Sequence, residues 1–304
     1  MLACLVIFFA VLSTVLTLSH VARAAAPPPR HVAAVKTPPA KAAPTWAAYD
    51  FRWVNAHQSP DLGVLATAGI LVDLDTRTVL WQRQPLVQRA PASLTKMVTA
   101  MVALDLASPD TVISITPSMT NVIPDTMGVV PGERVSVHDL LYGLFLDSGN
   151  DSAEVLAQGI VPRPVFLDLM NRKVRSLGLQ TTTFSNPTGL DDPGVRSSAY
   201  DLAMIAGYLS THYPLLMQVA GTQDKYIAAT PDHKAYEPVT LNKLLSVYAG
   251  ATGLKTGFTD DAGGCLAATA TRGGHHLVAI VLNSDYFFSD AENLLDYGFT
   301  VAGP

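Results

Sequence analysis

Three consecutive stretches near the C-terminal end of the chain have the composition of β-strands. They cover Ala251–Thr259, Gly264–Thr271 and His275–Leu282, and Arg272-Gly273-Gly274 predicts a tight turn between the last two. Near the other end, residues 68–81 form two more β-rich runs around a predicted hairpin turn. Because the strands stand at both ends, we expect them to join in one antiparallel sheet.

The segment between these strands is predicted to be mostly helical. The expected helices cover residues 93–107, 139–146, 152–158, 164–177 and 198–209, with a last one at 290–297. This order of elements predicts an α+β fold, in which an antiparallel sheet with flanking helices packs against a helical lobe. A cleft between sheet and lobe is the expected place for a site.

The composition supports a packed core and argues against some classes of function. Of the 304 residues, 49% are hydrophobic and 15% are charged, which is typical of a globular chain. Lys and Arg number 20 against 25 Asp and Glu, giving 20 − 25 = −5, so no nucleic-acid partner is expected. The cysteines are Cys4 and Cys265, with no C-x-x-C pair, so we expect no metal site and a buried Cys265.

The N-terminal part differs from the rest of the chain. Residues 1–24 hold an apolar run and an A-x-A-like site, which predicts a cleaved export signal or a retained membrane anchor. Residues 25–60 are rich in Ala and Pro and predict an extended linker. Residues 61–304 then form the expected folded domain. This organisation predicts an extracytoplasmic protein that is periplasmic, secreted or cell-surface, with possible membrane association through its N-terminus.

Ser93 and Lys96 stand one turn apart at the start of a predicted helix, so their side chains can meet. A serine hydroxyl becomes a good nucleophile when a base takes its proton. A lysine can be that base if burial or another cation lowers its pKa. The alternative interpretation is a solvated lysine beside a capping serine, and the rest of the chain must decide between them.

Two more short motifs follow in suitable places. Ser148-Gly149-Asn150 lies in a predicted turn between helices, and Lys255-Thr256-Gly257 lies in a predicted strand. Each has a structural alternative, as an ordinary turn and as a solvated strand edge. The order S-x-x-K, S-x-N, K-T-G is, however, the set found in penicillin-recognising serine enzymes.

The sequence resembles the D-alanyl-D-alanine carboxypeptidases, which are low-molecular-mass penicillin-binding proteins. The likeness extends over roughly residues 67–300. It is carried by residues 91–96 (Pro-Ala-Ser-Leu-Thr-Lys), 139–144 (Asp-Leu-Leu-Tyr-Gly-Leu), 148–151 (Ser-Gly-Asn-Asp), 184–192 (Phe-Ser-Asn-Pro-Thr-Gly-Leu-Asp-Asp) and 253–259 (Gly-Leu-Lys-Thr-Gly-Phe-Thr). The resemblance implies the fold of serine β-lactamases and penicillin-binding transpeptidases, with a five-stranded antiparallel sheet.

The resemblance also implies roles for individual residues, no cofactor and no metal. Ser93 would form an acyl-enzyme, Lys96 would be its base, and Ser148 would relay a proton. The implied substrate-binding residues are Asn150, Lys255, Thr256, Gly257 and Phe258. Backbone N–H groups of Ser93 and Phe258 would form the oxyanion hole. The implied partners are peptidoglycan stem peptides, with β-lactams as covalent inhibitors.

Three alternatives to a carboxypeptidase function remain. The chain stops soon after its last predicted helix, without the β-rich domain that many relatives add, which raises the chance of the related D,D-endopeptidases that cut cross-links and makes them the first alternative. A β-lactamase would need a deacylating glutamate, and Glu133 and Glu154 are the only glutamates between Ser93 and Glu237. We expect neither to serve, so deacylation of penicillin should be slow. The third rival is a non-catalytic cell-wall-binding protein on the same fold.

Overall fold

The computed structural model describes residues 59–302. The predicted signal or anchor at 1–24 and nearly all of the predicted linker lie outside the described residues. At the linker's end, the carbonyl of Pro60 accepts a hydrogen bond from the Trp81 indole, and the Ser59 hydroxyl accepts one from the Gln82 N–H. Within residues 59–302, no helix combines the length and the apolar composition that crossing a membrane requires.

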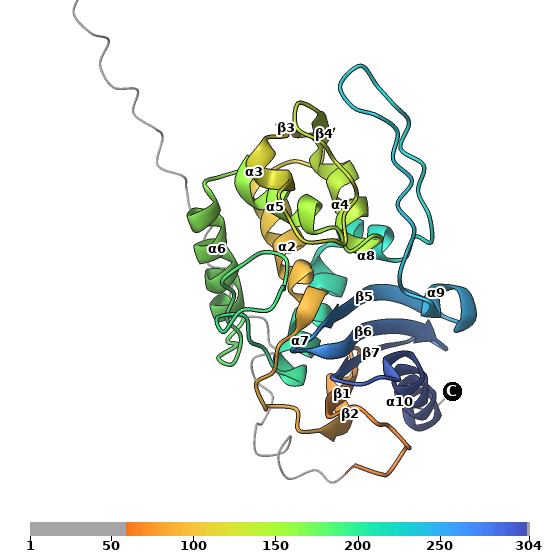
Figure 1. Cartoon of the computed structure of the whole chain (residues 1–304). Helices are drawn as coiled ribbons and strands as arrows, with labels where there is room; N and C mark the ends of the chain where they lie inside the picture. The colour runs from red at the N-terminus through yellow and green to blue at the C-terminus, as the bar shows by residue number, and fades with distance from the viewer. Residues whose placement is uncertain (1–58, 303–304) are drawn as a thin grey trace, which may run out of the picture. The chain divides into compact units, whose positions relative to one another are not determined.

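A five-stranded antiparallel sheet forms the centre of this part of the chain (Figure 1). Its order is β2-β1-β7-β6-β5, so β5 is an edge strand. The strands are β1 (Ala68–Asp73), β2 (Thr78–Arg83), β5 (Ala251–Thr259), β6 (Gly263–Arg272) and β7 (His275–Leu282). The N-terminal hairpin and the three C-terminal strands meet where β1 pairs with β7. The predicted joining of strands from both ends of the chain is confirmed.

The two faces of the sheet are covered by different parts of the chain. Leu71 and Leu277 pack with α10 (Phe287–Ala302), whereas Ile70 and Val278 point to the opposite face and join the core of the helical lobe. This alternation follows from the two-residue period of a strand. Both faces are therefore buried, and the sheet is a rigid platform.

The helical lobe lies between the two groups of strands in sequence. Its elements are η2 (Ala92–Thr95), α2 (Lys96–Leu106), β3 (Val112–Ser114), α3 (Pro117–Thr120), β4 (Arg134–Ser136), α4 (Val137–Phe145), α5 (Asn150–Gly159), α6 (Arg163–Ser176), α7 (Ala199–His212), α8 (Pro214–Ala220) and α9 (Leu244–Val247). Helix α2 runs through its core, since residues 96–103 are all buried. A helix that is apolar all round is buried on every side.

Two features of the lobe differ from the sequence prediction. The helix expected from Ser93 begins with the tighter 3-10 turn η2, as helix starts often do, and becomes α-helical at Lys96. The short helices α3, α8 and α9 were not predicted. Neither was the arm between α8 and α9, residues 222–243, which carries no clear periodicity.

The arm is held against the lobe by polar contacts. The buried carboxylate of Glu133 accepts hydrogen bonds from the Tyr236 hydroxyl and the Lys234 N–H. Farther along, the Val239 N–H donates to the Asp147 carboxylate at 3.1 Å. The arm thus reaches the residue directly before Ser148.

Candidate active site

Ser93 and Lys96 meet as their spacing predicts. The Nζ atom of Lys96 lies 2.7 Å from the Oγ atom of Ser93, one turn away across the start of α2. Lys96 is completely buried, whereas Ser93 is partly exposed. A lysine solvated at the surface is therefore excluded, and the serine hydroxyl faces both the buried amine and the outside.

Lys96 has two further partners. Its Nζ donates to the Oδ1 atom of Asn150 at 2.8 Å and to the backbone carbonyl of Thr188 at 2.9 Å. Both of these oxygens can only accept, but the Ser93 hydroxyl can also donate. A neutral lysine amine has two N–H donors and one lone pair. The three contacts can be made by an ammonium group with three N–H donors and also by a neutral amine whose lone pair faces the serine proton.

The electrostatic surroundings favour that neutral form. Burial lowers the pKa of Lys96 well below its usual range, and the positive charge of Lys255 lowers it further. The carboxylates of Asp125 and Asp151 act in the opposite direction and more weakly. The sequence analysis required burial or another cation to lower the pKa of Lys96; both do so here, and burial is the larger cause.

Lys255 is the second buried amine of the site. It lies on β5, is 1% exposed, and donates to the backbone carbonyl of Thr256 at 2.9 Å. Burial lowers its pKa to about 7, against the opposing effect of Asp125 and Asp147. Near neutral pH, Lys255 is therefore balanced between its charged and neutral forms.

The Ser148-Gly149-Asn150 segment joins α4 to α5, as predicted. Ser148 has a φ of 58° and is 4% exposed. The Nδ2 group of Asn150 donates to the Ile123 carbonyl at 2.8 Å, and its Oδ1 atom accepts from Lys96. Asn150 therefore positions Lys96, and within residues 59–302 its second N–H and second lone pair make no hydrogen bond, so both are available to a ligand.

The segment that contains residues 127–129 is held by the carboxylate of Asp151, which the sequence analysis did not assign to the site. Asp151 accepts hydrogen bonds from the backbone N–H groups of Met127, Gly128 and Val129. Thr188 is likewise a new participant, through its carbonyl. Both residues lie in stretches that carry the family resemblance, and that is the only sequence signal that could have found them.

The K-T-G segment places backbone rather than side chain next to the serine. A Cβ atom added at Gly257 would lie 2.8 Å from the Ser93 backbone nitrogen and 3.0 Å from the Ala92 Cβ. Glycine is thus the residue that lets β5 approach η2 this closely. Phe258 follows and is 66% exposed. The structure therefore brings Gly257 to the serine, and its neighbour's ring points to solvent.

Two predicted site hydroxyls have no partner in the described part of the chain. Neither the Ser148 hydroxyl nor the Thr256 hydroxyl makes a hydrogen bond among residues 59–302, although both residues are less than 10% exposed. Neither hydroxyl oxygen is among the fully buried unpartnered atoms of the described residues, so both remain accessible to solvent or to a ligand. Ser93, Lys96 and Asn150 are joined by direct hydrogen bonds, whereas Ser148 and Thr256 are available to an incoming molecule.

The glutamates considered for deacylation are occupied elsewhere. Glu154 accepts two hydrogen bonds from Arg163, both at 2.8 Å, and one from Gln158. Glu133 holds the arm. Neither carboxylate is bonded to a residue of the serine site, in agreement with the expectation that neither serves as a deacylating base.

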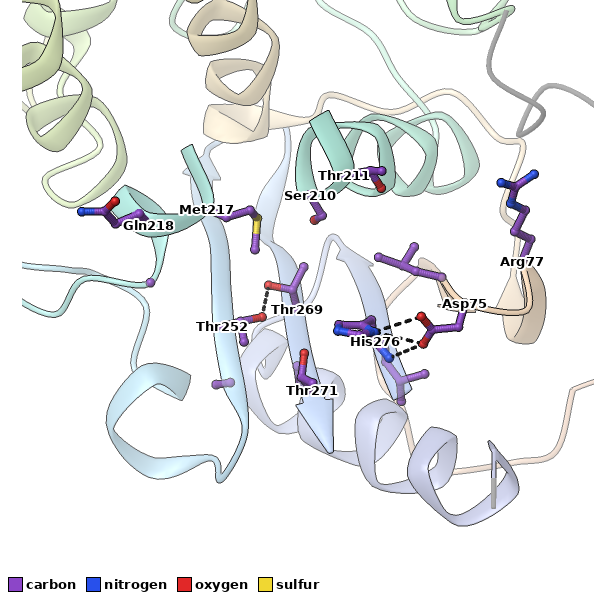
Figure 2. A pocket seen from close by; sticks show the side chains of 15 residues that line it. Asp75, Arg77, Ser210, Thr211, Met217, Gln218, Thr252, Thr269, Thr271 and His276 are labelled. Carbon is purple, nitrogen blue, oxygen red and sulfur yellow. Dashed lines mark hydrogen bonds and ion pairs between the residues drawn. The ribbon is translucent and has the colours of Figure 1, made fainter. Parts of the chain in front are cut away.

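A separate cavity of about 930 Å³ lies at the start of β5 (Figure 2). It contains none of the predicted site residues. Its lining includes Asp75, Ser210, Thr211, Thr252, Thr269, Thr271 and His276. The buried Cys265 is also outside the site, and burial raises the pKa of its thiol to about 11.

Comparison with known proteins agrees with this geometry. A family model described as D-alanyl-D-alanine carboxypeptidase matches residues 54–286. The chain is 32% identical over 246 residues to the D-alanyl-D-alanine carboxypeptidase DacF of Bacillus subtilis, covering 79% of this chain and 63% of that protein. It is also 32% identical over 264 residues to a D-alanyl-D-alanine carboxypeptidase of Mycobacterium tuberculosis, covering 84% of this chain and 89% of that protein.

The fold comparison agrees as well. The crystal structure of a DD-transpeptidase from Streptomyces superposes with a TM-score of 0.74 at 29% identity, covering 80% of this chain and 100% of that one. The fold predicted from the order of strands and helices is thereby confirmed. The family match, the fold and the joined serine and lysine agree, and the chain belongs to the D-alanyl-D-alanine carboxypeptidase family.

Proposed function

We propose that this protein is a serine D,D-carboxypeptidase that removes the terminal D-alanine from peptidoglycan stem pentapeptides. The observation that carries the proposal is the fully buried Lys96 amine at 2.7 Å from Ser93 Oγ, with two carbonyl oxygens as its other partners. This arrangement supplies a base for the serine without any cofactor or metal. The names of the relatives supply the substrate class.

The proposed reaction passes through an acyl-enzyme. Neutral Lys96 accepts the Ser93 proton while Oγ attacks the carbonyl carbon between the two D-alanines. The carbonyl oxygen becomes an oxyanion, which the backbone N–H groups of Ser93 and Phe258 stabilise. As the oxyanion collapses, the C–N bond breaks and Ser148 relays a proton to the leaving amine. Water then hydrolyses the ester to free the shortened peptide and Ser93.

The substrate is proposed to lie along the edge strand β5. The free side of an edge strand offers backbone N–H and C=O groups to an extended peptide. Lys255 and the Thr256 hydroxyl would receive the terminal carboxylate, with Asn150 at the amide backbone of the peptide. Gly257 lets this strand approach the serine. The half-protonated state of Lys255 near neutral pH is compatible with this role, since a bound carboxylate favours the charged amine.

β-Lactams are proposed as covalent inhibitors of the same serine. They present a carbonyl and a carboxylate to the groups that would receive the peptide. Because Glu154 is held by Arg163, no carboxylate is assigned to deacylation, and the penicilloyl ester should persist. The proposed location is extracytoplasmic, with residues 1–24 as export signal or anchor, residues 25–60 as linker and residues 61–304 as the catalytic domain.

A digest of purified muropeptides tests the proposed activity. Release of free D-alanine from monomeric pentapeptides is the expected result. Conversion of cross-linked dimers to monomers without that release would assign the D,D-endopeptidase activity instead. No product from either substrate, together with retained binding to cell walls, would favour the non-catalytic alternative. The variant Ser93→Ala is the control, since it should release nothing.

A further inference from the structure

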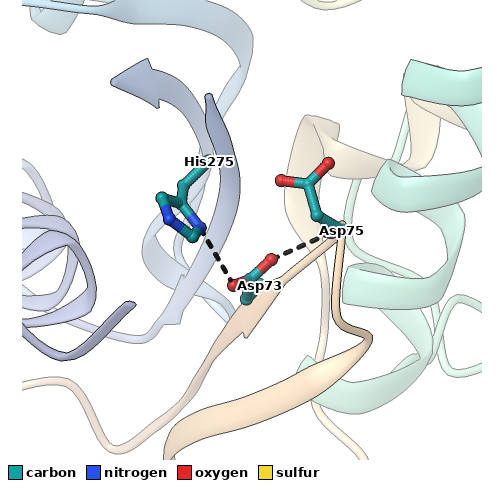
Figure 3. Close-up of side chains that lie close together, drawn as sticks. All are labelled: Asp73, Asp75 and His275. Carbon is teal, nitrogen blue, oxygen red and sulfur yellow. Dashed lines mark hydrogen bonds and ion pairs between the residues drawn. The ribbon is translucent and has the colours of Figure 1, made fainter. Parts of the chain in front are cut away.

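A cluster of metal-ligating side chains lies apart from the serine site, where two turns of the sheet meet (Figure 3). Asp73 ends β1, Asp75 follows in the β1–β2 turn, and His275 begins β7. Asp73 pairs with Leu277, so His275, two residues away, projects from the same face of the sheet. One ligand atom from each of the three side chains lies within 4.8 Å of the other two.

One buried atom in this cluster, the Nδ1 atom of His275, lacks a hydrogen-bond partner among the described residues. The Asp73 side chain is 3% exposed, and its Oδ1 atom accepts from the N–H groups of Asp75 and Thr76. Its Oδ2 atom lies 3.5 Å from the Nδ1 atom of His275, within ion-pair distance. An unsatisfied buried nitrogen in such a position is costly unless a water, an ion or another ligand satisfies it.

The separation of these two atoms suits a shared cation. Asp73 Oδ2 and His275 Nδ1 lie 3.5 Å apart, beyond the 2.7–3.2 Å range typical of an N–H···O hydrogen bond. Two ligands at about 2.0–2.2 Å from a tetrahedral zinc ion are themselves about 3.3–3.5 Å apart. The pair is therefore spaced like two ligands on one metal ion.

We propose that Asp73, Asp75 and His275 bind one divalent transition-metal ion of the zinc type, with water completing the coordination. Imidazole and carboxylate together suit such ions, whereas magnesium and calcium prefer oxygen ligands alone. His276 supports the site from outside, because its backbone N–H and its ring contact the Asp75 carboxylate at 2.7 and 2.9 Å. Asp75 and His276 also line the cavity of Figure 2, whereas Asp73 and His275 do not.

Such an ion would join the β1–β2 turn to the start of β7, where the N-terminal hairpin pairs with the C-terminal strands. Its expected effect is on stability, since a ligand that binds only the folded state stabilises that state. The inference does not depend on the proposed peptidase activity, because no residue of the cluster belongs to the serine site.

The test uses tag-free full chain treated with chelator and then titrated with zinc chloride by calorimetry. We expect one zinc ion per chain and, at zinc tenfold above the dissociation constant, a rise in Tm of about 3–6 °C. His275→Gln and Asp75→Asn should each weaken zinc binding at least tenfold. Asp75 is exposed, so its variant should fold even if a change at buried Asp73 prevents folding.

His138→Gln is the matched control. His138 also faces a carboxylate, Asp139, at 3.3 Å, but it belongs to no three-residue cluster among the described residues. Its loss should leave zinc binding unchanged. The proposal is overturned if the wild-type chain takes up no zinc, or if zinc binding survives in both His275→Gln and Asp75→Asn. Zinc uptake without any change in Tm would refute the proposed joining of the two turns.

Discussion

Gly257→Ala tests whether the close approach of β5 to η2 builds the oxyanion hole. The added Cβ would stand 2.8 Å from the Ser93 nitrogen and 3.4 Å from the Leu94 nitrogen. Ordinary van der Waals contact begins near 3.4 Å, so strand and turn must separate by about 0.6 Å, that is 3.4 − 2.8. Both neighbours are backbone atoms at a helix start, so neither can rotate away.

A shift of this size is large for a catalytic hydrogen bond. Oxyanion donors act at 2.7–3.1 Å, and loss of one donor typically costs about 10²–10³ in rate, or about 2.7–4 kcal/mol. We therefore expect Gly257→Ala to slow acylation by a fluorescent penicillin about 10²–10³-fold. The second-order rate constant of labelling measures this directly, and thermal unfolding reports whether the sheet survives.

Gly221→Ala serves as the matched control. Its added Cβ would also meet backbone, at 3.1 Å from the Thr252 carbonyl oxygen, but Gly221 lines the separate cavity instead of the serine site. Both variants should lose some stability, and only Gly257→Ala should lose acylation. Labelling of folded Gly257→Ala within threefold of wild type would refute the oxyanion-hole argument.

Four further outcomes are expected. Lys96→Ala should slow acylation about 10²–10⁴-fold, the usual contribution of a general base, with its fold retained by circular dichroism. With a carboxylate-bearing peptide, kcat/KM should fall as pH rises through about 7, because Lys255 loses its proton there; a C-terminal amide substrate should lack this decline. Tyr236→Phe removes a hydrogen bond to the Glu133 carboxylate, so it should lower the free energy of unfolding by about 1.5–3 kcal/mol and increase proteolysis within residues 222–243. Lys255→Met should lose acylation yet unfold at a higher temperature than wild type at pH 7.

The sequence predicted the sheet well because the pattern that marks each strand lies within the strand itself. The bounds of β5 and β7 agree with the prediction, since their apolar runs end at clear turn residues. The arm could not be predicted in the same way. Its conformation depends on Glu133, about a hundred residues away, through the Tyr236 hydroxyl and the Lys234 N–H. Contacts of this kind leave no periodic pattern in the arm itself.

The serine site shows the same difference between what the local sequence predicts and what remote contacts determine. The spacing of Ser93 and Lys96 was enough to predict their contact, because one helical turn fixes it. The partners that make Lys96 suitable as a base are remote: Asn150 and Thr188 supply its other oxygens across 54 and 92 residues of sequence. The sequence motifs thus identified the residues of the site, whereas the protonation state of Lys96 could be inferred only from the folded structure.

The expected gain in stability for Lys255→Met follows from the cost of burying the charged amine of Lys255. A lysine whose folded pKa is about 7 and whose unfolded pKa is about 10.4 opposes folding most strongly at and below pH 7, where folding must bury its charge. Between pH 7 and 10 the unfolded chain holds the extra proton, so this lysine makes stability rise with pH. Methionine fills the same space without charge. Lys255→Met should therefore unfold at a higher temperature at pH 7 and show a weaker rise in Tm between pH 7 and 9. If Tm rises equally with pH in the variant and in the wild type, Lys255 stays charged in the folded protein. The proposed balance between its two forms would then be wrong.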